Sequence, residues 1–579
     1  MGAQPKLFIL NPTSKVPDEI IGKAMNTAFE RSNKKIDIDF YRLMMDPRGA
    51  PSRETISSGD KQTLIEWMKI FYSNGMNIEH AIKANFNPFG LKAKKCFVDL
   101  LTDSGTGTFT AEQRAFLMEW IEKVPSMWTN AYAGSVPREM FDMVMENVFG
   151  NFSPAYADDR LYEQMGEKRF ATHLALQGRA AEFLLLNALV SAELLLPGSV
   201  IFSNKPFDTT KGHIDASGNR VISCTPLTTP RVYETQESRF LGNLPLAVLR
   251  QRYSENSGKA GAVLITVTDN GGGGQPVSMQ NIREVAEFAK ERGMLVWIDA
   301  CRIFENAEMI KLYEPGYENK SLADIVKEML SHADVVTMSF KKMYSDCGGA
   351  VLITKKSDIV GGKLEEVRKT IMQRTTTNYG NGFDSYCGLT GEGMIKIISG
   401  IFTAMDPEVI GDRIVQVNSA YKTLKQYGVP VVGGGHALYF AADQILPKVP
   451  DACCPAETLQ AIIHAAEAMR GCGLGNIVYG EYEKNDAGIY TLVGKPEMDS
   501  LRYAIPRLTY PDTVLNFMFN IIGKAYREGL LSDIENGMIA QNYVKDGFYH
   551  FSGKYMPVNE AEFMKKIRAL QEFVQAHLV

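Results

Sequence analysis

The chain has 579 residues, 45% of which are apolar, and its formal net charge at pH 7 is −5. This length allows a large buried core and predicts more than one domain. The slightly acidic balance offers no basic surface to a phosphate backbone, which argues against nucleic acid as a partner.

Neither a membrane span nor a disulfide framework is expected. The longest apolar stretch, residues 180–202, is interrupted by Glu182, Asn187 and Glu193. Charged side chains are costly inside a bilayer, so we interpret this stretch as a buried helix followed by a strand. The eight cysteines form no CxxC pair and no regular spacing, which argues against a disulfide framework and against a metal site. The apolar run at the start is too short for a signal peptide, so a soluble, cytoplasmic protein is expected.

Residues 1–97 are predicted to form an N-terminal extension and a segment of the small domain, with mixed helix and loop. They contain an amphipathic stretch at residues 62–72. No residue pattern in this region indicates a particular chemistry.

Residues 98–400 are predicted to form a large domain in which buried strands alternate with helices. The segment 278–292 has the apolar spacing of an amphipathic helix. Short runs rich in β-branched residues predict buried strands at residues 261–269, 294–300, 334–340 and 348–354. Strands and helices in this alternation predict a mainly parallel sheet covered by helices, and therefore an α/β fold.

Residues 401–579 are richer in helical patterns and are predicted to form a smaller α+β domain. The run at residues 430–442 is the clearest β-rich segment there.

Polar side chains follow two neighbouring strands of the predicted sheet, where ligands of open parallel sheets bind. Asp299 ends one strand, and the next runs into Ser339, Lys341 and Lys342. A lysine that forms a Schiff base and a carboxylate that keeps a ring nitrogen protonated would suit an aldehyde cofactor. On these residues alone a second interpretation stays open, in which Asp299 caps a helix and both lysines are solvated.

A phosphate site is predicted at Gln177, Gly178 and Arg179, which open a long apolar helix. The free N–H groups of a helix start favour an anion, and an arginine adds charge-assisted hydrogen bonds. An ordinary helix start remains the alternative. The glycine run 271–274 lacks the spacing of nucleotide-binding loops, which argues against a dinucleotide-binding dehydrogenase.

Ten segments, in this order, make the chain resemble the β-eliminating lyase family, which includes tryptophanase and tyrosine phenol-lyase. They are LLTDSGT (100–106), AYAGS (131–135), QGRAAE (177–182), FDTTKGH (207–213), NGGGGQPVSM (270–279), IDACRIFENA (298–307), ENKSLADIV (318–326), TMSFKK (337–342), GGHA (434–437) and LRYAIPR (501–507). The resemblance covers roughly residues 98 to 555. It implies an aspartate-aminotransferase-like fold, the cofactor pyridoxal 5′-phosphate, an amino-acid substrate and a homotetramer with active sites at a dimer interface.

The resemblance also implies roles at the cofactor. Lys342 would form the Schiff base, Lys341 would assist nearby, and Asp299 would hold the pyridine nitrogen. Arg302 would lie near the phenolic oxygen, and Phe207 would stack on the ring. The phosphate would be held by Gln177, Gly178, Arg179 and Ser339.

At the substrate, the resemblance implies that Arg502 binds the carboxylate, for which a planar guanidinium is well suited. Asn270 would hydrogen-bond the substrate carboxylate or the cofactor oxygen, and Ser104 would line the carboxylate pocket. Tyr132 would act as a general acid beside the phosphate, reaching in from a neighbouring subunit. The implied reaction is β-elimination, which releases pyruvate, ammonia and the leaving group.

Three positions bear on the leaving group. Tyrosine phenol-lyase has Thr where this chain has Asp208, and an Arg where this chain has Tyr479, which argues against elimination of phenol. Tryptophanase shares the Asp and has a histidine in a context like HFSGK, which gives His550 here. Asp208 and His550 would suit protonation of indole, so the resemblance favours a tryptophanase-like carbon–carbon lyase. Tyr479 matches neither enzyme and would alter the wall of the substrate pocket.

The resemblance leaves a potassium (K+) requirement open. Asn130 stands where the family has a glutamate at its monovalent-cation site, and the segment 341–349 is one residue shorter than in the family. Other reactions also remain open: elimination from an S-substituted cysteine, β-replacement or transamination, all of which use the same lysine, aspartate and arginine. A cofactor-free binding protein is disfavoured, because Lys342, Asp299, Arg179 and Arg502 are all present.

Overall fold

The computed structural model describes residues 76–93, 96–125, 135–152, 170–224, 240–354, 362–374, 389–486, 490–543 and 549–578. The expected general acid Tyr132, the cation-site position Asn130 and the amphipathic stretch 62–72 lie outside the described residues.

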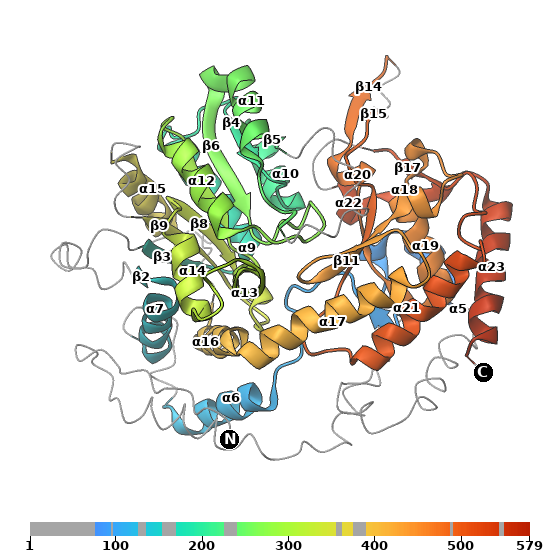
Figure 1. Ribbon diagram of the computed structural model, residues 1–579, viewed down its shortest axis with the longest axis horizontal. Helices are drawn as coiled ribbons and strands as arrows, with labels where there is room; N and C mark the ends of the chain where they lie inside the picture. Colours follow the sequence, from blue (N-terminus) through green and yellow to red (C-terminus); the bar gives the residue numbers. More distant parts are fainter. Residues whose placement is uncertain are drawn as a thin grey trace.

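An eight-stranded sheet forms the centre of the large domain, in the order β2-β3-β9-β8-β7-β6-β4-β5 (Figure 1). Neighbouring strands are parallel except at β9, which is antiparallel to both β3 and β8. The predicted α/β class and the mainly parallel sheet are therefore confirmed. The strands are β2 (Asn151–Phe152), β3 (Phe170–Ala175), β4 (Val200–Ser203), β5 (Arg220–Ser223), β6 (Ala260–Thr266), β7 (Leu295–Asp299), β8 (Val335–Ser339) and β9 (Gly349–Thr354).

Both faces of this sheet are buried, because helices cover each of them. In β6, Val263 and Ile265 join one apolar core, whereas Ala262 and Leu264 join the core on the opposite face. This alternation explains why the strands read as continuous apolar runs. The helices of this domain are α6 (Ala111–Lys123), α7 (Val136–Phe149), α9 (Gly178–Ser191), α10 (Asp208–Ala216), α11 (Leu246–Asn256), α12 (Met279–Lys290), α13 (Ile303–Tyr313), α14 (Leu322–Leu330), α15 (Lys363–Met372) and α16 (Gly391–Met405), with 3-10 turns η6 (Ser257–Lys259) and η7 (Phe340–Lys342).

The C-terminal part of the chain is built on a four-stranded antiparallel sheet, β10-β11-β16-β13. Its strands are β10 (Val431–Gly433), β11 (Ala437–Ala441), β13 (Cys472–Leu474) and β16 (Ser500–Ala504), and its main helices are α17 (Pro407–Lys425), α19 (Pro455–Glu467), α21 (Asp512–Arg527) and α23 (Glu560–Ala576). Shorter elements are α18 (Ala442–Ile445), α20 (Asn476–Tyr479), α22 (Tyr549–Ser552), β14 (Glu481–Lys484), β15 (Tyr490–Gly494), β17 (Met538–Gln541), β18 (Lys554–Pro557) and η10 (Asp451–Cys453).

The β-rich run 430–442 forms two strands joined by a turn rather than one strand. A Cβ on Gly434 would lie only 2.5 Å from the carbonyl oxygen of Gly273, so this turn sits directly against the glycine run of the large domain. The glycines therefore allow close backbone contact between the two domains.

Elements near the predicted domain boundaries contact both parts of the chain. The N-terminal α5 (Met76–Lys83) and η1 (Pro88–Gly90) lie with the small domain, where β1 (Val98–Asp99) pairs with β12 (Met469–Arg470). Residue 400 falls inside α16, and α17 supplies side chains to both cores. The division at residues 97 and 400 stays a prediction.

Among the described residues, no helix is long and apolar enough to cross a membrane. The same residues contain no group of three or more His, Cys, Asp or Glu side chains placed to hold a metal ion.

Candidate active site

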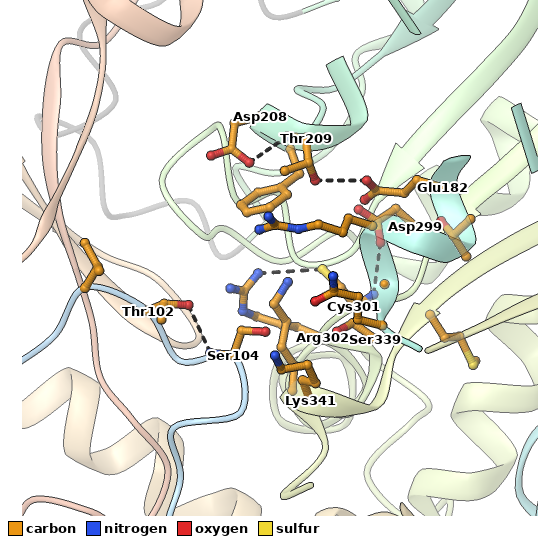
Figure 2. Close-up of a pocket in the computed structure, with 18 of the residues that line it drawn as sticks. Thr102, Ser104, Glu182, Asp208, Thr209, Asp299, Cys301, Arg302, Ser339 and Lys341 are labelled. Atoms are coloured by element: carbon orange, nitrogen blue, oxygen red, sulfur yellow. Dashed lines mark hydrogen bonds between the residues drawn. The ribbon is translucent and has the colours of Figure 1, made fainter. Parts of the chain in front are cut away.

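A pocket lies at the carboxyl ends of β7 and β8, where the large domain meets the small domain (Figure 2). Both domains and the segment 101–104 contribute to its wall. The sequence-predicted residues that line it are Ser104, Gln177, Gly178, Arg179, Phe207, Asp208, Asp299, Arg302, Ser339, Lys341, Lys342 and Arg502. The fold thus brings together groups that are up to 398 positions apart in the sequence, from residue 104 to residue 502.

Asp299 and Lys342 face the same pocket from neighbouring strand ends. Asp299 is the last residue of β7, and Lys342 ends the 3-10 turn η7 that follows β8. Both are buried, with 4% and 8% of their surfaces exposed. Burial raises the pKa of Asp299, and the nearby ammonium of Lys342 partly offsets this. The Lys342 Nζ lies 4.8 Å from the centre of the Phe207 ring, so a flat group in the pocket would contact both side chains.

The start of α9 is suited to an anion. Gln177 is its N-cap residue, and no side chain of the described residues caps the helix there. The first N–H groups are therefore available to a ligand. Gly178 lies against Ser339 so closely that a Cβ on it would come within 2.7 Å of the Ser339 Cβ. Burial lowers the pKa of Lys341, as do the positive charges of Arg179 and Lys342.

Arg502 enters the pocket from β16 of the small domain. Its Nη1 donates to Asn270 Oδ1 at 3.1 Å, and its Nη2 donates to the Leu101 carbonyl at 3.2 Å. The Tyr439 hydroxyl also donates to Asn270 Oδ1, at 3.0 Å. Arg502 Nε and Asn270 Nδ2 are buried without a hydrogen-bond partner among the described residues. Of these two donors, Arg502 Nε belongs to a residue that lines the pocket, so a bound carboxylate would supply the partner that such a buried group normally has.

Asp208 and His550 form a buried pair at the edge of the pocket. His550 Nε2 lies 2.9 Å from Asp208 Oδ2, and each residue is 4% exposed. Burial alone would raise the pKa of Asp208, but the hydrogen bond and charge of His550 outweigh it and the pKa is lowered. Asp208 lines the pocket, whereas His550 lies behind it, in contact with the lining residues Asp208, Phe89 and Phe551.

A family model described as beta-eliminating lyase matches residues 135–519. The chain belongs to the β-eliminating lyase family. The match includes β3 to β16 and thus most of the pocket.

Individual relatives have different activities at similar identity. A tryptophanase of Hyphomonas neptunium is 32% identical over 76% of this chain and 86% of its own length. A probable beta-eliminating lyase of Trichomonas vaginalis is 34% identical over 75% of this chain and 85% of its own. A tyrosine phenol-lyase of Symbiobacterium thermophilum is 31% identical over 78% of this chain and 89% of its own. Identity therefore does not choose between leaving groups within the β-eliminating lyase family.

Three sequence-predicted residues stand behind the pocket wall instead of lining it: Asn270, Tyr479 and His550. Asn270 accepts a hydrogen bond from Arg502, and His550 is hydrogen-bonded to Asp208, so each contacts a residue that lines the pocket. The Tyr479 hydroxyl donates to the Pro206 carbonyl at 3.3 Å, and its ring lies 5.0 Å from Lys205 Nζ. Tyr479 thus contacts the loop that leads into Phe207.

Sequence reasoning missed several residues of the pocket wall. Phe89 precedes the region matched by the family model, and no pattern around it indicated a role. Glu182 belongs to the family segment QGRAAE without an implied role, although it follows Gly178 by four positions and so lies on the same side of α9. The other lining residues without a predicted role are Leu101, Thr102, Thr209, Cys301, Thr337, Met338 and Phe551.

Arg302 does not reach freely into the pocket, because a buried carboxylate holds it. Its Nε and Nη2 donate to the two oxygens of Asp103, at 3.0 and 2.8 Å. Arg507 Nη1 donates to the carbonyl of Asp103 at 3.1 Å and to its Oδ2 at 3.2 Å. Arg507 also bonds Glu305, and Arg413 lies 3.6 Å from Asp103. This buried ion network joins the segment 101–104 to both domains, and nothing in the sequence pattern indicated it.

Proposed function

We propose that this chain is a pyridoxal-phosphate-dependent lyase that removes the β-substituent from an L-amino acid and releases pyruvate and ammonia. The observation that carries the proposal is the convergence of Lys342, Asp299, the start of α9 and Arg502 on one pocket. These groups supply an amine, an acid partner for a ring nitrogen, a phosphate cradle and a carboxylate clamp.

The residues present fit this cofactor. The uncapped start of α9 and the close approach of Gly178 to Ser339 leave backbone N–H groups for a phosphate. Phe207 offers a ring face, and Asp299 offers a buried carboxylate for a pyridine nitrogen. When bound, pyridoxal phosphate supplies an aldehyde that condenses with amines and a ring that accepts electrons from the substrate Cα.

The side chains then have distinct tasks. Lys342 takes the proton from the substrate Cα, and the buried Asp299 holds the proton on the ring nitrogen. Arg502, oriented by Asn270 and the Leu101 carbonyl, binds the substrate carboxylate and fixes the direction in which Cα faces Lys342.

An aromatic leaving group is supported by the wall around Asp208 and His550. Phe89 and Phe551 line the pocket, with ring centres 4.8 Å apart, and His550 lies edge-on to Phe89 at 5.7 Å. Aromatic walls favour a flat apolar substituent, and the Asp208–His550 pair supplies a proton at its edge. We therefore propose L-tryptophan as substrate and indole as leaving group.

The substrate assignment is tested by incubating the purified protein with pyridoxal phosphate and L-tryptophan. Release of indole and pyruvate in equal amounts is expected. Pyruvate from S-alkyl cysteines but not from tryptophan would keep the lyase chemistry and overturn the aromatic leaving group. Transfer of the amino group to a keto acid without pyruvate release would overturn elimination.

Replacing Gly178 with alanine is expected to weaken cofactor binding. The new Cβ would overlap Ser339 at the helix start, and overpacking of this kind costs about 1–3 kcal/mol. A dissociation constant for pyridoxal phosphate raised by about tenfold or more is the expected result, measured by equilibrium dialysis. Gly258→Ala is the matched control, because a Cβ there meets nothing within 4 Å. Equal affinities of the two variants would contradict the phosphate cradle.

Replacing His550 with glutamine is expected to slow elimination more for a substrate whose leaving group must be protonated than for one whose leaving group departs as an anion. With L-tryptophan, kcat is expected to fall by about 100-fold or more, the usual contribution of a general acid. With β-chloroalanine, whose chloride leaves without a proton, the fall is expected to be small. His577→Gln is the control, since His577 lies in the C-terminal residues of the chain and bonds the Phe573 carbonyl. An equal loss with both substrates would show that His550 has no role at the leaving group.

We also propose, from the family resemblance, a homotetramer with active sites at a dimer interface. The tetramer, the cytoplasmic location and any potassium requirement stay predictions. Light scattering of the purified protein measures the oligomeric state, and the rate of pyruvate release with potassium or with sodium as the monovalent cation measures the potassium requirement.

A further inference from the structure

Glu182 is a buried carboxylate in the wall of the pocket. It lies in α9, one turn after Gly178, and is 6% exposed. Thr209 Oγ1 donates to its Oε2 at 2.9 Å (Figure 2). Thr210 Oγ1 donates to its Oε1 at 2.8 Å. Across the described part of the chain, no lysine or arginine lies within ion-pair distance of Glu182.

Placing a carboxylate in this position is unfavourable. Burial and, to a smaller extent, the neighbouring carboxylate of Asp299 raise the pKa of Glu182 to about 8, although the two threonine hydroxyls and Lys342 act in the opposite direction. A buried acid without a paired cation destabilises the folded chain unless its hydrogen bonds and surroundings compensate. Groups of this kind cluster where a protein holds its functional residues in place.

The two threonines connect Glu182 to the residues that face the reaction. Phe207 is the N-cap residue of α10, and Asp208, Thr209 and Thr210 form its first turn. The N–H of Thr209 also donates to Asp208 Oδ1, at 2.6 Å. Glu182 therefore joins two helix starts. One is the start of α9, which would hold the phosphate, and the other is the start of α10, which carries Phe207 and Asp208.

We propose that Glu182 is a positioning residue that fixes the first turn of α10 against the first turns of α9. This inference rests on the proposed function. Glu182 acts through Thr209 and Thr210 and not on the reacting atoms. Its two hydrogen bonds fix the turn that carries Phe207 and Asp208, so that Phe207 would be placed to stack on a bound cofactor ring and Asp208 to face the β-substituent. Small displacements of such groups reduce rates strongly, even when binding is retained.

The experiment compares the wild-type protein with Glu182→Ala, Glu182→Gln and the double variant Thr209→Val/Thr210→Val, each loaded with pyridoxal phosphate. Two quantities are measured: the visible circular dichroism of the bound cofactor, which reports its fixed orientation, and kcat and KM with L-tryptophan and β-chloroalanine. Glutamine is the matched control, because its amide accepts one hydroxyl hydrogen bond and donates another. Far-ultraviolet circular dichroism checks that each variant is folded.

In Glu182→Ala we expect a weaker visible dichroism at full cofactor occupancy. The kcat with L-tryptophan is expected to fall by about 10- to 100-fold, more than with β-chloroalanine, while KM changes little. The double threonine variant is expected to match Glu182→Ala, and Glu182→Gln is expected to retain most of the wild-type dichroism and rate. If Glu182→Ala does not fold, the glutamine and double threonine variants give the same comparison.

Wild-type dichroism and kcat in both Glu182→Ala and the double threonine variant would overturn the inference. Loss of dichroism in Glu182→Gln equal to that in Glu182→Ala would also overturn it, because the hydrogen bonds would then not be the cause. In both cases the wild-type protein still binds the cofactor and releases pyruvate. Absence of cofactor binding and of pyruvate in the wild-type protein itself would instead contradict the proposed function.

Discussion

Replacing Lys342 with alanine is expected to abolish elimination, with a fall in kcat of at least about 10⁴-fold. The side chain serves both as the amine that anchors the cofactor and as the base at the substrate Cα, so one substitution removes two functions. The absorption band of lysine-bound cofactor is expected to disappear together with pyruvate release. Both are measured on the same sample, before and after addition of L-tryptophan.

Lys341→Ala is the matched control, because Lys341 is the adjacent residue and lines the same pocket. This variant is expected to keep the absorption band and part of the activity, since the amine that binds the cofactor is still present. The opposite pattern, with the band lost in Lys341→Ala and kept in Lys342→Ala, would contradict the proposal, because it would show that Lys341 anchors the cofactor.

The second large effect is expected at Asp103. Its replacement by asparagine would leave the guanidinium groups of Arg302, Arg413 and Arg507 with Glu305 as the remaining carboxylate of the buried network. Breaking a buried ion pair from one side costs about 3–5 kcal/mol, because the partner charge stays buried. The free energy of unfolding, measured by urea titration without cofactor, is expected to fall by about this amount.

The pH dependence of this loss has a defined sign. Burial alone would raise the pKa of Asp103, but Arg302 and Arg507 outweigh it and hold the pKa well below its usual range. A carboxyl whose pKa is lowered by folding stabilises the protein above its unfolded pKa, about 3.9, and loses that contribution as the pH falls. The difference between wild type and Asp103→Asn is therefore expected to be constant at neutral pH and to shrink in acid.

Glu79→Gln provides the control for Asp103→Asn. Glu79 pairs with Lys83 on the surface, where the two side chains are 67% and 70% exposed. An exposed pair of this kind contributes less than about 1 kcal/mol. If Asp103→Asn were no less stable than Glu79→Gln, the network would not hold the two domains together at the pocket.

The middle of the central sheet, β6 to β9, could be predicted from the sequence because these strands are buried on both faces. Continuous apolar runs such as 294–300 have no other stable place than a buried strand, and the structure forms β7 there. The direction of β9 could not be predicted, because an antiparallel strand buried on both faces has the same apolar pattern as a parallel one. In the run 430–442, contact between Gly434 and Gly273 divides the segment, and this contact exists only in the folded chain.

The pocket likewise contains residues that could be predicted from the sequence and residues that could not. Asp299, Lys342 and Gly178 lie at the ends of predicted strands or at the start of a predicted helix, so the local sequence indicates their place in the pocket. Asp103 and Arg507 meet across 404 positions, and no local pattern records that contact. Phe89 enters the wall because Asn87 donates to the carbonyls of His550 and Gly553, which fixes the N-terminal segment beside α22. Such long-range contacts depend on the packing of the two domains.

The most direct test of the central claim is borohydride reduction of the purified protein after addition of pyridoxal phosphate, followed by peptide mapping with mass spectrometry. Reduction makes the bond between the cofactor and its lysine permanent, so the modified peptide identifies the anchoring residue. We expect the pyridoxyl group on Lys342. A pyridoxyl group only on lysines outside the pocket, or on no lysine, would contradict the assignment of this pocket as the active site of a pyridoxal-phosphate lyase.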